Sequence, residues 1–216
     1  MLKSLLQRAR EARAAELGDG EGLEEGFTLI ELMVVLLIIA ILLAIAIPTF
    51  LGVTSSASDR ASQSNLTNAL TEAKAIFQNS SSYGTNAAAL TAFQASAPEF
   101  TWGTGACTTN SNCISEQVVD VSAAGDGEGL TLATWSSKDS TCWYALDLEA
   151  TPASQAAETS PLIAYWTPAN PAAAPATTAG VFYAKLVNSS ANCSGNYAAT
   201  HANFTWGTSY ANAPVG

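Results

Sequence analysis

A long apolar run near the N-terminus dominates the hydrophobic pattern of this chain. Residues 32–47 are Leu, Ile, Val, Met and Ala without interruption, and no ionisable residue occurs between Leu32 and Ser58. A run of this length and hydropathy is typical of a helix that spans a membrane. At about 1.5 Å per residue, a helix from Phe27 to Gln78 would be about 78 Å long. The pattern therefore predicts one long helix, and its first half is apolar on every face.

From residue 58 to residue 78 the pattern becomes that of an amphipathic helix. Its apolar stripe comprises Ala61, Leu66, Ala69, Leu70, Ala73, Ile76 and Phe77. The polar residues 79–82 and the glycine that follows Tyr83 should end the helix. Pro48 lacks a backbone N–H and Gly52 lowers helix propensity, so we expect a kink or a frayed turn between about residues 45 and 56.

Beyond Tyr83 the apolar period shortens to that of β-strands. Strands are predicted at residues 117–122 and 130–135, and the glycine-rich turn between them would make a hairpin. Two more strands are predicted at 142–148 and 181–187. We therefore predict an α+β fold, in which a small antiparallel sheet packs on the amphipathic half of the long helix.

Two further features of this C-terminal part are irregular. Residues 151–180 contain five prolines and predict a surface excursion, within which 162–166 are a candidate edge strand. Phe-Thr-Trp-Gly-Thr occurs at 100–104 and again at 204–208, and it predicts two similar junctions between a strand and a turn.

The junction before the apolar run contains the most informative residues. Residues 1–17 have the spacing of an amphipathic helix, and a charged segment then leads to Gly26. Directly after Gly26 comes Phe27-Thr28-Leu29-Ile30-Glu31, so Glu31 is a single carboxylate at the edge of the apolar run. A carboxylate buried without a partner is costly, and we therefore expect another group to neutralise Glu31.

This junction resembles the N-terminal signature of type IV prepilins and related pseudopilins. The resemblance covers about residues 26–83, and it says little about the C-terminal part. The positions that match the family are Gly26, Phe27, Thr28, Leu29, Ile30, Glu31 and Pro48.

The resemblance implies that a prepilin peptidase cuts the chain after Gly26 and N-methylates Phe27, so that the apolar helix stays in the mature protein. It also implies that the freed amino group of Phe27 pairs with Glu31 of a neighbouring subunit. Inner-membrane pilus assembly machinery would then add each subunit to a helical homo-oligomeric filament. Taken without its flanking residues, Glu31 would be a carboxylate favoured by the helix dipole, or an interfacial charge on a single-pass anchor.

Four segments are expected from the pattern and the resemblance together. Residues 1–26 would be a cleaved leader and 27–52 a transmembrane and filament-core helix. Residues 53–83 would be the amphipathic half of the same helix, and 84–216 an extracellular head.

The charge distribution predicts the membrane orientation. The net charge is −10, but residues 1–26 carry four of the eight Lys and Arg residues, directly before the apolar run. This placement favours a cytoplasmic N-terminus and a translocated C-terminal part. Residues 27–216 carry four bases and twelve acids, so we expect no strong binding of nucleic acid.

The four cysteines of this translocated part predict disulfides. Three pairings are possible, and we favour Cys107 with Cys113 and Cys142 with Cys193. Zinc is the competing interpretation, but the chain has no Cys-x-x-Cys pair and one histidine, His201. No metal site and no cofactor are predicted.

Enzymatic function has little support in the sequence. The chain has neither Gly-x-Ser-x-Gly nor His-Glu-x-x-His, and we predict no catalytic residues. Asp120, Asp126 and Glu128 lack the spacing of a calcium loop and are expected to be solvated loop acids.

The leading hypothesis is a structural subunit that polymerises into a surface filament for adhesion, twitching motility or DNA uptake. It would be held in the cytoplasmic membrane before assembly and lie in the cell-surface filament afterwards. One alternative is a minor pilin or a pseudopilin of the kind used in type II secretion. An alternative of another class is a monomeric membrane-anchored module that binds carbohydrate through its aromatic residues, since the chain contains five tryptophans.

Overall fold

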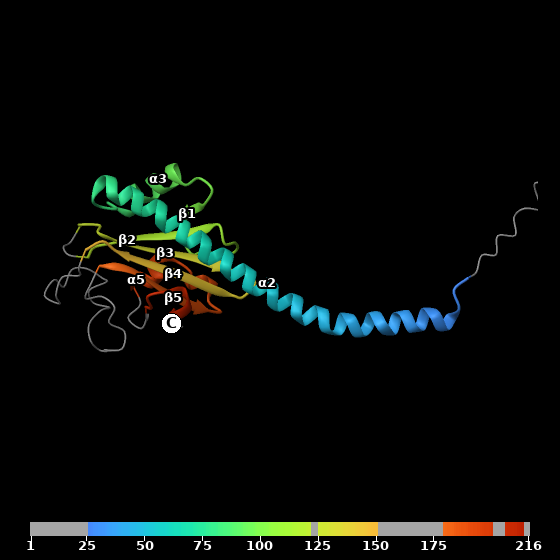
Figure 1. Cartoon of the computed structure of the whole chain (residues 1–216). Coiled ribbons are helices and arrows are strands. Elements are labelled where there is room, and N and C mark those ends of the chain that lie inside the picture. The colour runs from blue at the N-terminus through green and yellow to red at the C-terminus, as the bar shows by residue number, and fades with distance from the viewer. Residues whose placement is uncertain (1–25, 122–124, 151–178, 201–205, 214–216) are drawn as a thin grey trace, which may run out of the picture. The chain divides into compact units, whose positions relative to one another are not determined.

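A computed structural model describes residues 26–121, 125–150, 179–200 and 206–213 of the chain (Figure 1). Its contacts divide the chain into two compact units, residues 1–50 and residues 51–216. Helix α2 (Leu29–Ser80) begins in the first unit and ends in the second. It is a single helix of 52 residues, which confirms the long helix expected from the hydrophobic pattern.

Helix α2 remains helical through residues 45–56, so the frayed turn proposed there is wrong. Pro48 lacks the backbone donor that would bond the carbonyl of Ala44, four residues before it. The hydroxyl of Thr49 donates to the next two carbonyls, those of Ile45 (3.1 Å) and Ala46 (2.9 Å). The kink at Pro48 and Gly52 stays a prediction.

The described residues of the second unit form a sheet of five strands in the order β1-β2-β3-β4-β5. Neighbouring strands are antiparallel, except that β1 and β2 are parallel. The strands are β1 (Thr101–Gly103), β2 (Cys113–Val119), β3 (Gly129–Ser136), β4 (Thr141–Leu148) and β5 (Gly180–Val187). Three of the four predicted strands are confirmed as β3, β4 and β5, and so are the β2–β3 hairpin and the α+β fold. The strand predicted at 117–122 is shifted, since β2 begins at Cys113 and ends at Val119.

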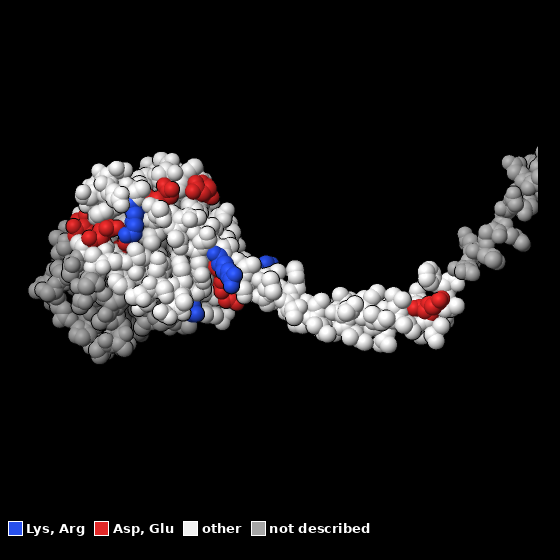
Figure 2. All heavy atoms as spheres, viewed as in Figure 1, with Lys and Arg blue, Asp and Glu red and all other residues white. Residues whose placement is uncertain are grey.

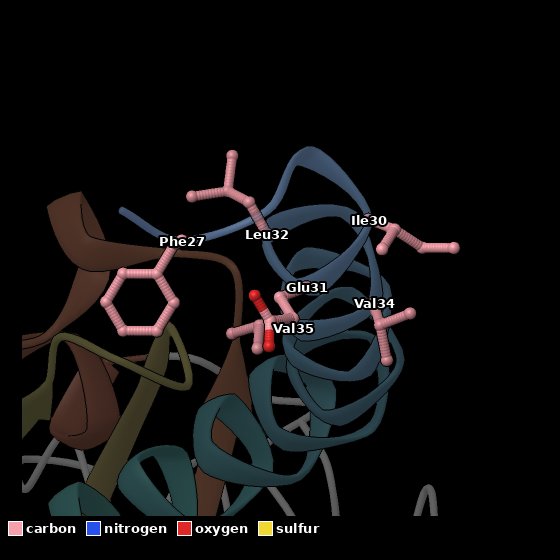
Figure 3. Close-up of a pocket in the computed structure, with 6 residues that line it drawn as sticks. All are labelled: Phe27, Ile30, Glu31, Leu32, Val34 and Val35. Atoms are coloured by element: carbon pink, nitrogen blue, oxygen red, sulfur yellow. The ribbon is translucent and has the colours of Figure 1, made fainter. Parts of the chain in front are cut away.

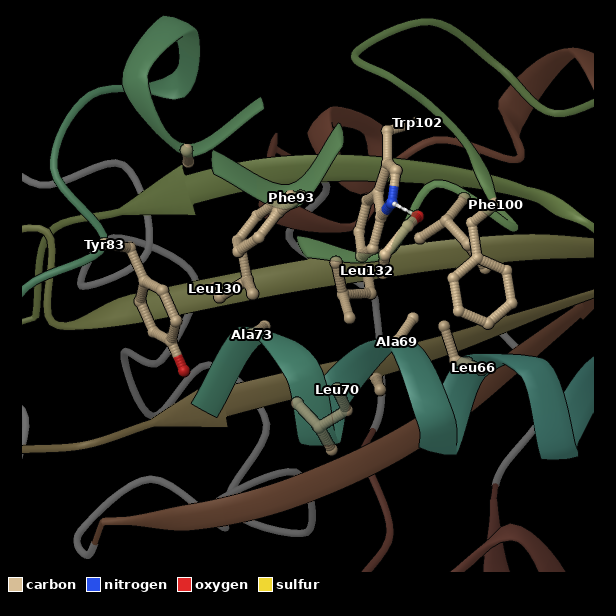
Figure 4. Packing of buried hydrophobic residues seen from close by; sticks show 14 of the residues in the cluster. Leu66, Ala69, Leu70, Ala73, Tyr83, Phe93, Phe100, Trp102, Leu130 and Leu132 are labelled. Carbon is tan, nitrogen blue, oxygen red and sulfur yellow. Dashed lines mark hydrogen bonds between the residues drawn. The ribbon is translucent and has the colours of Figure 1, made fainter. Parts of the chain in front are cut away.

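One face of the sheet is covered by the second half of α2 and by α3 (Asn86–Ser96). Leu66, Ala69 and Ala73 of α2 point at the sheet and pack with Leu130 and Leu132 of β3 (Figure 4). The amphipathic stripe is confirmed with one correction. Ala61 is exposed, and Ser62 is buried in its place because its hydroxyl donates to carbonyls of Ser58 (3.1 Å) and Trp135 (3.4 Å).

The opposite face of the sheet carries a second cluster, to which α5 (Gly195–Thr200) contributes Ala198. Cys142 and Tyr144 of β4 point into this cluster, whereas Trp143 and Ala145 point at α2. Strand β4 is therefore buried along its whole length. Its sequence alternates between two buried faces and not between a buried and an exposed one.

Two disulfides tie this unit together. Cys107 bonds Cys113 and closes the loop between β1 and β2, and Cys142 of β4 bonds Cys193 after the 3-10 helix η2 (Ser190–Asn192). These are the two pairs that we favoured among the three possible pairings.

Some expectations were incomplete. The helices α3 and α5 were not predicted, although the hydroxyl of Thr85 caps α3 by accepting from the backbone N–H of Ala88. The first Phe-Thr-Trp-Gly-Thr copy contains β1, as expected. In the second copy, Gly207 forms a bridge with Tyr183, but residues 204–205 lie outside the described residues. Residues 1–25 of the predicted leader and residues 151–178 of the excursion predicted at 151–180, with its candidate edge strand, also lie outside them. Gly180 is the first residue of β5.

Candidate functional site

Glu31 takes part in a capping box at the start of α2. The helix begins at Leu29, so Thr28 is the N-cap residue and Glu31 is the third helical residue. The carboxylate of Glu31 accepts from the backbone N–H of Thr28 (2.8 Å) and from its hydroxyl (2.7 Å), and the hydroxyl of Thr28 accepts from the N–H of Glu31 (3.3 Å). Reciprocal bonds of this type satisfy donors that a helix N-terminus would otherwise leave free. They also hold the carboxylate beside the first turn.

The surroundings of Glu31 are apolar. It borders an open hollow whose other lining residues are Phe27, Ile30, Leu32, Val34 and Val35 (Figure 3). Phe27 itself is 87% exposed. Within residues 26–50, the described part of the first unit, Glu31 is thus the single charged group on an otherwise apolar surface.

The apolar surface extends along the whole of this unit. Every described side chain from residue 26 to residue 50 is exposed, and the most apolar window of α2 has a mean hydropathy of 3.2. Among the described residues, α2 is the one helix long and apolar enough to cross a membrane. A continuous apolar surface of this size requires lipid or other apolar helices around it.

The position of Gly26 is open. A Cβ atom built on Gly26 would meet no atom within 4 Å, and the same holds at Gly52. The fold of this chain therefore does not require glycine at position 26. Any requirement for glycine there would come from a molecule that acts on the chain.

A cluster of charged residues joins α2 to β4. Lys74 Nζ lies 2.8 Å from Asp147 Oδ1 and 2.9 Å from Glu149 Oε1, and the hydroxyl of Tyr83 donates to Asp147 Oδ2 (2.6 Å). Burial raises the pKa of Asp147, whereas the bonds from Lys74 and Tyr83 lower it. Burial would lower the pKa of Lys74, but its contacts with Asp147 and Glu149 outweigh this and raise it. No local sequence pattern indicated this cluster, because Lys74 and Tyr83 lie far from Asp147 and Glu149 along the chain.

Glu116 is a second buried carboxyl group. It lies on β2 opposite Leu132 and is 0% exposed, and neither of its carboxyl oxygens has a hydrogen-bond partner among the residues that the structure describes. Burial raises the pKa of Glu116 to about 7. A buried acid without a donor is most stable in its neutral form.

We expect Glu116→Gln to stabilise the protein at alkaline pH. The pKa of Glu116 is raised from 4.5 to about 7 in the folded state. Below pH 4.5 the ionisation of Glu116 therefore does not reduce the free energy of unfolding, and this free energy falls as the pH rises from about 4.5 to about 7. The shift of the pKa from 4.5 to about 7 corresponds to a loss of about 3 kcal/mol in the free energy of unfolding at alkaline pH. Denaturant unfolding of the full chain in detergent micelles at pH 5 and pH 9 measures this.

The matched control for this prediction is Glu99→Gln, since Glu99 is exposed. A Glu116→Gln variant that follows the wild-type pH dependence would contradict the assignment.

The other candidate groups of the second unit have structural roles. Trp102, Trp135 and Trp143 are buried, so they offer no stacking surface for a sugar, and Trp166 lies outside the described residues. Asp126 Oδ1 accepts from the backbone N–H groups of Val121 (3.0 Å) and Glu128 (3.2 Å) within the β2–β3 turn. Over the described ranges, no group of three or more metal-ligating side chains is present.

The structure brings some of the predicted site residues together. Glu31 is joined to Thr28, for which the sequence analysis gave no role, although the spacing Thr-x-x-Glu is the signature of a capping box. Pro48 lies in the first unit, and Gly52 and the four cysteines lie in the second.

Comparison with known proteins gives one match. Residues 23–47 match the family model for the prokaryotic N-terminal methylation motif. No curated protein and no solved structure matches the chain. The match includes Gly26, Phe27 and Glu31, and it ends one residue before Pro48. The chain therefore carries the class III signal peptide of type IV pilins, and this motif supports a protein of the type IV pilin or pseudopilin type.

Proposed function

We propose that this protein is a type IV pilin that polymerises through its N-terminal helix into a surface filament. Residues 1–26 are the leader, 27–52 span the membrane and later form the filament core, 53–83 continue the helix, and 84–216 form the extracellular head. The observation that carries the proposal is the exposed apolar surface of residues 27–50, which directly follows Gly26 and contains one carboxylate. Such a surface suits a helix that exchanges lipid for other copies of itself.

Processing would supply the partner of Glu31. Cleavage by a prepilin peptidase after Gly26 would free the amino group of Phe27, the residue directly before the N-cap Thr28. N-methylation would leave this cation charged. Both charges are costly to bury unpaired, whereas a pair recovers part of that cost in an apolar environment. The amino group of one subunit would therefore pair with Glu31 of its neighbour.

The apolar side chains alone would not drive this assembly. A bundle of helices is about as apolar as lipid, so Leu, Ile and Val gain little when they leave the bilayer. Packing between helices and the ion pair would therefore decide the direction of the exchange. The filament would serve adhesion, twitching motility or DNA uptake.

Mass spectrometry of sheared surface material tests this proposal. We expect one abundant species that starts at N-methylated Phe27 and contains two disulfides. A protein that still starts at Met1, without polymer, would contradict the proposal and favour the monomeric anchored module. A correctly processed protein that is scarce at the surface would instead favour the minor pilin or pseudopilin.

A bulky residue at position 26 should block processing. Since a Cβ at Gly26 meets no atom within 4 Å, Gly26→Leu should leave the fold intact and affect the peptidase only. We expect the intact mass of this variant to retain the leader, with at least a tenfold loss of processed protein, or about 1.4 kcal/mol in transition-state stabilisation. Gly26→Ala, the smallest change, is the matched control and should be processed at least in part. A normally processed Gly26→Leu variant would contradict the assignment of the cleavage site.

A further inference from the structure

One end of the sheet lies against the part of α2 that directly follows the apolar run. We call this region the exit end. It comprises residues 136–141 and 185–188 at the end of the sheet, together with residues 55–60 of α2, which lie against them. Ser55 Oγ donates to Asp139 Oδ1 in the β3–β4 turn (2.8 Å), and Trp143 Nε1 donates to Asp59 Oδ1 (3.1 Å). Within the second unit, these bonds join the β3–β4 turn and β4 to α2.

The exit end contains three of the four bases that follow Gly26 in the sequence: Arg60, Lys138 and Lys185. Arg60 and Lys138 are exposed, and the ammonium group of Lys185 lies over the ring of Trp143, 5.6 Å from its centroid. Both ion pairs found among the described residues involve Lys74, which lies elsewhere. Figure 2 shows most of the visible Lys and Arg atoms grouped where α2 leaves the sheet.

Two carboxylates also lie at the exit end, but bonds within the protein occupy them. Asp139 accepts from Ser55 and from the hydroxyl of Thr141 (3.1 Å to Oδ2), and Asp59 accepts from Trp143. Asp59 and Asp139 also interact with each other, and Lys185 acts on Asp139 through its charge. With three cations and at most two anions, the exit end has a net positive charge.

The remainder of the second unit has the opposite charge. Its other described residues include eight acids and one base, Lys74. The acids are Glu72, Glu99, Glu116, Asp120, Asp126, Glu128, Asp147 and Glu149. The positive exit end is therefore a local feature of an acidic head.

The number of helical residues between the apolar run and the exit end determines how far Arg60, Lys138 and Lys185 lie from the hydrocarbon core of the membrane. The hydrocarbon core of a bilayer takes about 20 helical residues, which from Leu32 reaches about residue 52. Arg60 follows Val53, the last large apolar residue of the run, by about 10 Å of helix. A headgroup layer is about 5–7 Å thick on each side, so the exit end lies at or just above it.

We propose that the exit end docks on anionic phospholipid headgroups of the outer leaflet while the protein is held in the membrane before assembly. This inference rests on the proposed function only in that residues 27–52 span the bilayer. Exposed Lys and Arg side chains near an anionic surface bind it through long-range attraction, and the acidic remainder of the head is repelled from it. The head is thereby held with its positive end on the lipid. Assembly must break these contacts when the subunit leaves the membrane.

The test uses the full chain in nanodiscs. One set contains phosphatidylcholine only, and the other contains phosphatidylcholine mixed with phosphatidylglycerol. A water-soluble acetylating reagent modifies lysine amines, and mass spectrometry gives the rate at each lysine. At low salt we expect Lys138 to react about fivefold more slowly in the anionic discs, the effect of one basic residue at such a surface. High salt should remove this protection. Lys74, which is paired with two carboxylates away from the exit end, is the internal reference.

The double variant Arg60→Gln with Lys138→Gln tests whether the charges of the exit end cause the binding to lipid. Both side chains are exposed, so the fold should persist, and near-ultraviolet circular dichroism checks this. Lys185 should also react more slowly in the anionic discs when the protein is wild type. We expect the double variant to lose this difference in acetylation rate at Lys185, whereas Glu99→Gln should keep it.

Equal rates at Lys138 in the two kinds of disc would overturn the proposal. Protection that depends on the number of protein copies per disc, and not on the lipid, would overturn it in favour of contact with a second copy. A protein that does not enter the discs at all would count against the proposed function itself.

Discussion

Glu31→Ala should abolish surface filaments while the leader is still removed. The variant loses the carboxylate that would pair with the amino group of a neighbouring Phe27, and the cleavage site at Gly26 is unchanged. An amino group left alone in an apolar bundle is costly, so each added subunit would be destabilised by several kcal/mol. Even about 1.4 kcal/mol lowers an association constant tenfold, and this loss recurs at every subunit. Electron microscopy of cell surfaces and the yield of sheared filament measure the result.

Glu31→Gln separates the ionic role from the capping role. A glutamine can still accept from the N–H and the hydroxyl of Thr28, as Glu31 does at 2.8 and 2.7 Å. It cannot neutralise an amino group. If filaments form normally with glutamine, charge pairing is not what joins the subunits. If only alanine prevents filaments, the capping box itself is the essential element.

Lys74→Met should have the second largest effect, on the stability of the head. The change leaves Asp147, which is 0% exposed, with Tyr83 as its remaining partner in the cluster that joins α2 to β4. Breaking a buried pair costs about 3–5 kcal/mol. We expect about 3 kcal/mol at pH 8, since Lys74 is 33% exposed and part of its interaction is screened by water.

The effect of Lys74→Met should depend on pH. Contact with Lys74 lowers the pKa of Asp147, so its loss raises this pKa further above the ordinary value of 3.8. Asp147 can then fold as a neutral acid at low pH, and the destabilisation is smaller at pH 5 than at pH 8. Denaturant unfolding of the full chain in detergent at both pH values gives the two free energies.

A second substitution controls this experiment. Lys74→Met combined with Asp147→Asn removes the buried charge and should recover most of the lost stability. Glu149→Gln should have a smaller effect, because Glu149 is 25% exposed. Equal stability of Lys74→Met and the wild type at pH 8 would show that the cluster does not hold α2 on the sheet.

Local patterns predicted the regular parts of this protein. The apolar run and the stripe that includes Leu66 and Ala73 each have a period that one helix satisfies, and α2 satisfies both. The strand predicted at 142–148 was found as β4, but its burial on both faces was not foreseen. An alternating sequence shows which residues share a face, and only the packed structure shows that α2 covers one face and α5 the other.

Features that depend on distant residues were not predictable in this way. Helix α3 is rich in alanine, and such a short apolar stretch gives no strong periodicity, so it was missed. The contacts of Lys74 with Asp147 and Glu149 join residues more than seventy positions apart, and no local pattern reports them. Ser62 replaced Ala61 in the stripe because a polar side chain can be buried where backbone carbonyls accept its hydroxyl.

The bonds between Thr28 and Glu31 would affect the energetics of growth in the proposed filament. Because the Glu31 carboxylate already accepts two bonds from Thr28, part of its desolvation cost is offset in the unassembled subunit. When a neighbouring subunit joins, Glu31 would exchange its bonds to Thr28 for the pair with the amino group of Phe27. The net gain in free energy per subunit would therefore be modest. A molecular motor could then drive both growth and disassembly at the base of a fibre, because the electrostatic free energy changes little when one subunit is added or removed.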